Sequence, residues 1–146
     1  MRTPLRYLIA AACLLAGSFA FAAEDAKAEP NPDLAKTAAL SWLKLIDDEK
    51  YEDSWKEAAA YFQGRVTAQA WSERLSQIRR PLGHTDKREF KEANFVHEAP
   101  RLPKGDYWQI QYATSIEGTA VIETATVTLD KDGKWHVLSY QIKQAS

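Results

Sequence analysis

The chain has 146 residues and carries 19 basic against 20 acidic side chains, a formal net charge of −1. This length is typical of a single domain. The near balance of charge leaves no basic surface for nucleic acid or for an anionic membrane, so we expect neither as a partner.

The first 22 residues are typical of a cleavable secretion signal. Arg2 and Arg6 supply the positive start, residues 7–17 are apolar or small, and Ala20-Phe21-Ala22 has the small-x-small pattern that signal peptidase reads. The apolar run is shorter than the about 20 residues that a membrane span needs. We therefore predict cleavage after Ala22, no transmembrane segment in the mature chain, and a periplasmic location. Full secretion and outer-membrane association stay open as alternatives.

Cys13 is the one cysteine of the chain, and it lies inside the predicted signal. The mature chain, residues 23–146, would then have no disulfide, no thiolate nucleophile and no cysteine metal ligand. We do not expect a lipid on Cys13, because Ala10 stands where a lipoprotein signal normally has a branched apolar residue. Without Arg2 and Arg6 the balance is 17 basic against 20 acidic side chains, a net charge of −3.

Three amphipathic helices are predicted after a flexible leader over residues 23–31. Asn31 is a suitable N-cap, Pro32 suits the first helical position, and the first helix runs to about Asp47. The second helix is predicted over residues 51–64, and Thr67 caps a third that ends before Pro81. The three apolar faces are Ala35, Ala38, Ala39, Trp42, Leu43 and Ile46; Tyr51, Trp55, Ala58, Ala59 and Phe62; and Ala68, Trp71, Leu75 and Ile78.

The pattern then changes to the two-residue period of strands. Strands are predicted over residues 87–97, with an irregular middle at Ala93-Asn94, and over 106–116, 119–129 and 134–142. On the third strand the apolar face is Val121, Ala125, Val127 and Leu129, and on the fourth it is Leu138, Tyr140 and Ile142. Helices followed by closely connected strands predict one α+β domain over residues 32–146.

Several segments resemble the bacterial family known as domain of unknown function 4019. They are Ala39–Asp47, Tyr51 with Ser54–Ala59, Trp71, Arg79–Gly83, and Trp135–Val137 with Tyr140. The resemblance implies no established activity and no catalytic residue. The order of the elements is also similar to the cystatin-like and nuclear-transport-factor-like cone. The expected fold is therefore α+β, with three N-terminal helices packed on a four-stranded curved antiparallel sheet.

Two groups of polar residues are better explained by structure than by chemistry. The cluster Asp47-Asp48-Glu49 follows a helix and lacks the alternating ligands and turning glycine of a calcium loop, so we interpret it as solvated charge, with Asp47 capping the next helix or pairing with a lysine. His84, His97 and His136 lie far apart in the sequence, and no two have a metal-ligand spacing. We therefore predict no metal and no cofactor.

The doublet Arg79-Arg80 stands at a predicted helix end. Cations are favourable there for electrostatic reasons, so a structural role is the preferred interpretation and anion binding is the alternative.

Glu123 and His136 are the two ionisable residues that could line a pocket. By alternation each shares a strand face with apolar residues, beside Trp108 and Tyr112. If both faces point to the helices, the four residues form a candidate pocket in which burial would shift the pKa values of the two ionisable groups. The alternative places both at a wet strand end, and one bulge would reverse either side.

Three functions follow, in order of preference. The first is a non-enzymatic periplasmic domain that binds a small molecule or a protein, since nucleophile elbows, phosphate loops and dinucleotide fingerprints are absent from the sequence. The second is a small cone-fold enzyme that uses Glu123 or His136 as acid/base in an apolar pocket, with both side chains converging on one cavity. The third is a structural domain that forms a homodimer through its sheet.

Overall fold

The computed structural model describes residues 29–146. The predicted signal peptide, Cys13 and most of the predicted leader lie outside the described residues. The elements, in chain order, are α1 (Asp33–Asp47), α2 (Tyr51–Lys56), α3 (Ala60–Gln63), α4 (Ala68–Arg79), β1 (Thr85–His97), β2 (Asp106–Ile116), β3 (Thr119–Leu129) and β4 (Trp135–Gln144).

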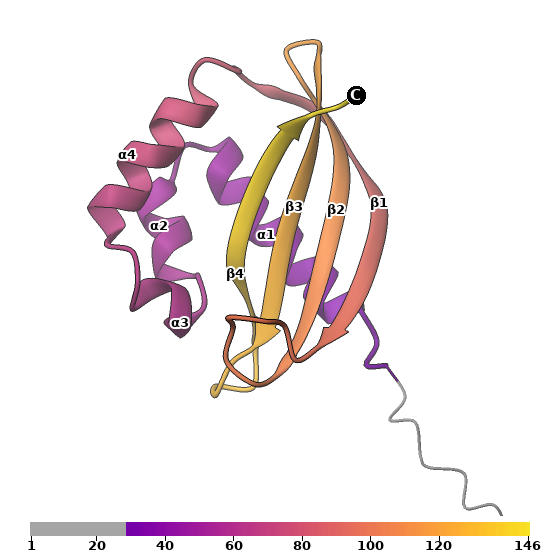
Figure 1. Ribbon diagram of the computed structural model, residues 1–146. Helices are drawn as coiled ribbons and strands as arrows, with labels where there is room; N and C mark the ends of the chain where they lie inside the picture. Colours follow the sequence, from indigo (N-terminus) through magenta and orange to yellow (C-terminus); the bar gives the residue numbers. More distant parts are fainter. Residues whose placement is uncertain (1–28) are drawn as a thin grey trace, which may run out of the picture.

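The four strands form one antiparallel sheet in the order β1-β2-β3-β4, in which each strand pairs with its sequence neighbours. The strands bow together, and α1 crosses one face of the sheet while α2, α3 and α4 stand beyond the edge formed by β4 (Figure 1). This arrangement confirms the predicted α+β fold. The helices occupy one face and one edge of the sheet, so the two layers meet along α1 and β4.

The first and last helices start close to the predicted positions. Asn31 Oδ1 accepts a hydrogen bond from the Asp33 N–H at 2.9 Å, although α1 begins at Asp33 and its N-cap position is occupied by Pro32 rather than by Asn31. Thr67 caps α4 as predicted, because its hydroxyl oxygen accepts from the Ala70 N–H at 3.2 Å. These side chains satisfy backbone donors that the first turn of a helix leaves unpaired.

The predicted second helix is two short helices separated at Ala59. The backbone of Ala59 is extended (φ −58°, ψ 144°), and its N–H donates to the Val137 carbonyl of β4 at 2.9 Å. The next N–H, that of Ala60, donates to the Asp130 carboxylate at 2.9 Å. A continuous helix would use both donors internally, so bonds to the sheet interrupt it.

The main core lies between α1, α2, α4 and the sheet. Trp42 and Trp71 are both buried, and their indole N–H groups donate to the backbone carbonyl and the hydroxyl of Ser54 at 2.8 and 3.0 Å. Trp55 donates to the Val66 carbonyl at 2.6 Å. The three tryptophans are therefore core residues, as predicted, and burying each large side chain stabilises the fold by about 1.5–3 kcal/mol.

Three register shifts interrupt the pairing of the outer strands. In β1 they lie between Thr85 and Lys87 and between Phe90 and Glu92, not at Ala93-Asn94. In β4 Leu138 is the extra residue, since Thr126 pairs with Ser139 and Val127 pairs with Val137. A bulge places two residues against one and reverses the alternation beyond it.

The bulge in β4 corrects the predicted apolar face of that strand. Val137 joins Tyr140 in the main core, whereas Leu138 packs with Tyr107 and Ala59 in a smaller cluster. The expected face of Leu138, Tyr140 and Ile142 was therefore wrong at Leu138. Leu129, expected on the apolar face of β3, is 51% exposed at the strand end.

The buried face of α4 also differs from the prediction near its C-terminal end. Ile78 is 36% exposed, while its neighbour Arg79 is only 3% exposed. Arg79 therefore continues the buried stripe of Trp71 and Leu75 at helical spacing. A charged side chain in that position requires partners of opposite charge.

Candidate functional site

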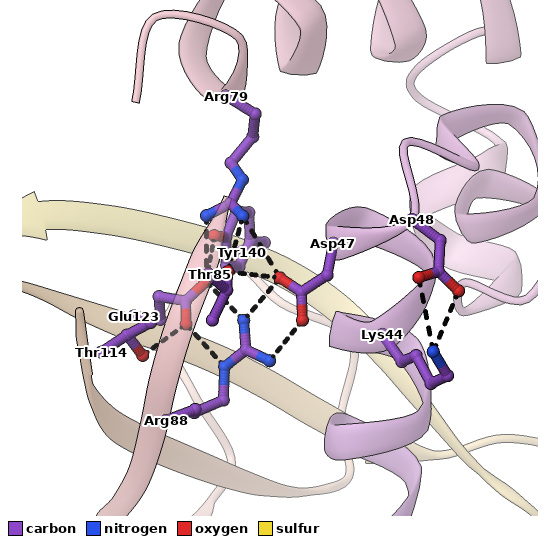
Figure 2. A network of polar contacts seen from close by, with 9 residues as sticks. All are labelled: Lys44, Asp47, Asp48, Arg79, Thr85, Arg88, Thr114, Glu123 and Tyr140. Carbon is purple, nitrogen blue, oxygen red and sulfur yellow. Dashed lines mark hydrogen bonds and ion pairs between the residues drawn. The ribbon is translucent and has the colours of Figure 1, made fainter. Parts of the chain in front are cut away.

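Two carboxylates and two guanidinium groups meet where the helices join the sheet (Figure 2). Asp47 ends α1, Arg79 ends α4, Arg88 lies in β1 and Glu123 in β3. We call these four residues the ion cluster. The two positive and two negative charges balance, which is the condition under which charges can be buried at acceptable cost.

Arg88 is the centre of the ion cluster. Its Nη1 and Nη2 donate to the two oxygens of Asp47 at 2.7 and 2.9 Å. Its Nε and Nη2 donate to the two oxygens of Glu123 at 2.7 and 3.2 Å. Because the planar guanidinium matches two carboxylates at once, Arg88 holds α1 and β3 in a defined relative position.

Arg79 makes fewer hydrogen bonds than Arg88. Its Nη2 donates to Asp47 Oδ1 at 3.2 Å and to the Thr85 hydroxyl at 3.0 Å, and its Nη1 lies 3.7 Å from Glu123 Oε1. The buried Nε and Nη1 atoms have no hydrogen-bond partner. Unsatisfied buried donors are uncommon in folded proteins and cost about 1–3 kcal/mol each.

Glu123 is fully buried and hydrogen-bonded on both oxygens. The hydroxyl of Thr114 donates to Oε2 and that of Tyr140 donates to Oε1, each at 2.6 Å, in addition to the bonds from Arg88. Burial, together with the negative charge and hydrogen bond of Glu123, raises the pKa of Tyr140. Tyr140 therefore stays a neutral donor, and the Glu123 carboxylate is held as an acceptor.

The electrostatics of the ion cluster favour its charged form. Burial by itself would raise the pKa of Asp47, but the hydrogen bonds and positive charge of Arg88, with Thr85 and Arg79, outweigh it and lower that pKa. Burial would likewise lower the pKa of Arg88, and the bonds to Asp47 and Glu123 outweigh it. Both effects follow from opposite charges in a poorly solvated site.

A polar pocket of about 270 Å³ adjoins the ion cluster. It shares Asp47 and Arg79 with the cluster, and its other residues come from the α1–α2 connection, the end of α4 and the β2–β3 turn. They are Ile46, Glu49, Tyr51, Arg80, Pro81, Gly83, His84 and Glu117. Glu117 accepts a hydrogen bond from the His84 N–H at 3.3 Å. The pocket is lined by charged groups of both signs.

The four residues of the predicted pocket are not brought together. Trp108 and Tyr112 are buried on the helix-facing side of β2, and neither the Trp108 indole N–H nor the Tyr112 hydroxyl has a hydrogen-bond partner. Burial and the charge of Glu123, opposed by Arg88, raise the pKa of Tyr112 to about 12. Glu123 faces the same side, opposite Tyr112 in the register.

His136 lies elsewhere. It pairs with Thr128 in β3, five residues from Glu123, which is about 16 Å along a strand. Because five is an odd number, alternation places His136 and Glu123 on opposite faces of the sheet. The structure therefore does not support an acid/base pair formed by these two residues.

The partners of His136 explain its position. Nδ1 is 3.0 Å from the Glu57 carbonyl oxygen, and Nε2 is 2.7 Å from Asp132 Oδ2. Both partners are acceptors, so the ring donates twice when it is protonated. Burial would lower the pKa of His136, but these two hydrogen bonds and the charge of Asp132 raise it.

The acidic cluster at the end of α1 divides into separate environments. Asp47 belongs to the ion cluster and pairs with two arginines rather than with a lysine, whereas Asp48 is an exposed partner of Lys44 at 3.1 Å (Figure 2). Sequence reasoning missed the ion cluster. The available signals were two charged residues at positions where the apolar pattern of an element continues. They are Arg79, four residues after Leu75, and Glu123, between Val121 and Ala125.

Neither metal ligation nor a membrane span is found in the part of the chain that the structure describes. Within residues 29–146, no group of three or more His, Cys, Asp or Glu side chains is placed to hold a metal ion. No helix in the same range has the length and apolar character needed to cross a bilayer. His84 is exposed at the rim of the polar pocket, and His97 pairs with Asp106 at 2.6 Å.

The observations define an α+β domain in which a buried ion cluster joins a helical layer to an antiparallel sheet. A family model described as a protein of unknown function, DUF4019, matches residues 38–140. The chain belongs to this family, which confirms the resemblance noted from the sequence. No curated protein and no solved structure matches the chain significantly. The likeness to the cystatin-like and nuclear-transport-factor-like cone stays a prediction.

Proposed function

We propose that this chain is an exported binding domain of the bacterial cell envelope, located in the periplasm. In this proposal the polar pocket takes a small zwitterionic molecule, of the size and charge of an amino acid, and releases it unchanged. The observation that carries the proposal is the lining of the pocket by charged side chains of both signs, Arg79 and Arg80 against Asp47, Glu49 and Glu117.

The lining of the polar pocket supports a ligand with two opposite charges. Arg79 and Arg80 line the pocket, and the exposed Arg80 offers its guanidinium group to a carboxylate. Glu49 and Glu117 line the same pocket and suit an ammonium group. A ligand with a single negative charge would meet these two carboxylates, so the charge pattern favours a zwitterion over a simple anion.

Binding is preferred to catalysis because the buried carboxylate is fully engaged. Both oxygens of Glu123 accept hydrogen bonds from Arg88, and each accepts one more from a hydroxyl, that of Thr114 or Tyr140. A general base must be within reach of a substrate proton and must have a free lone pair directed to it. The arrangement therefore supports a structural role for Glu123.

Isothermal titration calorimetry with the twenty L-amino acids tests the ligand class. We expect saturable binding of at least one of them, and at least about tenfold weaker binding of the matching compound that lacks either the amine or the carboxylate, a loss of about 1.4 kcal/mol. Arg80→Gln should weaken binding by a similar factor, while Arg74→Gln, on the same helix but outside the pocket, should not. Absence of binding by every amino acid, or equal binding to both variants, would refute the proposal.

Two further measurements test whether the chain is exported and whether it lacks catalytic activity. Osmotic shock of the host cells should release a chain whose amino terminus is Ala23, and an unprocessed chain retained in the cytosol would contradict export. Panels of ester, phosphoester, peptide and glycoside substrates should show no turnover. Turnover that is lost in Glu123→Gln, with the fold retained, would replace the binding proposal by an enzymatic one.

A further inference from the structure

The two edges of the sheet differ in how they are protected against pairing with another strand. β1 carries six charged residues over residues 86–92, and its register is broken by a bulge at Lys91. Charges and bulges on an edge strand prevent unwanted pairing. β4 also has a bulge, at Leu138, but it has no charged residue between Val137 and Ile142. Beyond the bulge, the edge from Ser139 to Ile142 therefore lacks the charges that protect β1.

The backbone of β4 is free along this part. The Val137 carbonyl accepts from Ala59 on the outer side, which covers one end of the edge. Within the described chain, the backbone groups from Ser139 to Ile142 make ladder bonds with β3 and no hydrogen bond on the outer side. Such groups are a template for an additional strand.

A groove of about 320 Å³ lies along the free edge, between β4 and the helices α3 and α4. The helices contribute four apolar residues to the lining, Phe62, Trp71, Leu75 and Ile78, together with Arg74. Ile78, which the sequence pattern predicted to be buried, is 36% exposed there. A strand edge facing a helix across an apolar groove is the geometry in which extended peptides add to a sheet and insert alternate side chains into pockets.

The charge of the groove indicates the chemistry of its occupant. Arg74 is the single charged residue of the lining, and it makes no ion pair or hydrogen bond with any residue of the described chain. The lining contains no carboxylate. A second copy of this chain would present its own β4, whose only charged residue besides His136 is Lys143, and would leave Arg74 unpaired.

We propose that the groove between α4 and β4 binds an extended peptide of a partner protein, which adds to Ser139–Ile142 as a fifth strand. The peptide alternates apolar residues, directed at Phe62 and Ile78, with outward residues, and it carries an acidic side chain that pairs with Arg74. This site is separate from the polar pocket and does not depend on a ligand bound there.

Panning a phage-displayed library of random ten-residue peptides on the purified full chain provides the probe. The selected peptides, synthesised with a fluorescent label, should share alternating apolar residues and one acidic residue. Their binding should shift the backbone amide NMR signals of Ser139–Ile142. No enrichment, enrichment of basic peptides, or shifts confined to β1 would overturn the proposal.

A charge exchange gives the sharper test, because Arg74 is exposed and its replacement leaves the core intact. Arg74→Glu should weaken binding of the acidic peptide at least tenfold, and changing that acidic residue to lysine should restore it. Lys91→Glu, the same charge reversal on the opposite edge, should have no effect. Equal weakening by both variants, or concentration-dependent dimerisation that shifts the Ser139–Ile142 signals without peptide, would refute a peptide site.

Discussion

Replacing Arg88 by methionine is the most direct test of the ion cluster, because this side chain makes four hydrogen bonds to two carboxylates. In Arg88→Met the fully buried Glu123 keeps one cationic neighbour of the cluster, Arg79, at 3.7 Å. Removing one partner of a buried ion pair costs about 3–5 kcal/mol. For a domain of this size that is a fall in melting temperature of roughly 10–20 °C.

Lys87→Met is the matched control, since it removes the same charge from the preceding residue of β1. The Lys87 side chain is 69% exposed and pairs with Glu89 on the surface, so we expect a change of at most about 0.5 kcal/mol. Urea unfolding followed by tryptophan fluorescence measures both variants, with thermal unfolding by circular dichroism as the second readout. If Arg88→Met and Lys87→Met agree within about 0.5 kcal/mol, the ion cluster does not stabilise the fold in the way argued.

A double variant separates the lost contact from the charge left behind. Glu123→Gln alone should destabilise the protein, but Arg88→Met with Glu123→Gln should cost less than the two single changes added together. The coupling expected for residues in direct contact is about 0.5–3 kcal/mol. Strict additivity would show that the two side chains act independently.

Two further predictions concern the turn beside the polar pocket and the histidine of β4. Gly83 and Gly133 have φ +87° and +77°, so Gly83→Ala and Gly133→Ala should each cost about 1–2 kcal/mol in backbone strain. A Cβ at Gly83 would lie 2.2 Å from Glu117 Cδ, but this is the far end of a flexible side chain, so the two costs in urea unfolding should be similar; a much larger cost at Gly83 would show that Glu117 is fixed in place. The pKa of His136 is raised in the folded state, so its bond to Asp132 stabilises fully below the unfolded pKa of about 6.5 and loses its effect as the pH rises through the folded pKa. His136→Gln should therefore destabilise more at pH 5.5 than at pH 8, and a cost that does not change with pH would refute the protonated pair.

The amino-acid sequence by itself determined the order and most boundaries of the elements. The structure has strands at Asp106–Ile116 and Thr119–Leu129, where alternation predicted them, and α4 starts after the Thr67 cap. These features depend on residues within a few positions of each other, so a local period or a capping side chain is enough to specify them. The α+β class follows from the order of the elements, which the same local signals specify.

Only the tertiary structure decided the features that depend on distant residues. Ala59 leaves the helix because its N–H reaches Val137, and the bulge at Leu138 is set by pairing with β3. Because of this bulge, His136 and Leu138 do not share the face of Tyr140, where alternation along the strand was expected to place them.

The candidate site likewise depends on residues that are far apart in the sequence. Asp47 and Arg88 are 41 residues apart in the chain, and Glu123 is 35 residues from Arg88. Nothing in the local pattern says which opposite charge a buried side chain will meet, because that is fixed by how α1 and α4 pack on the sheet. Arg79 on the apolar stripe of a helix and Glu123 on the apolar face of a strand were the signs of this cluster in the sequence, and their partners became visible only in the folded chain.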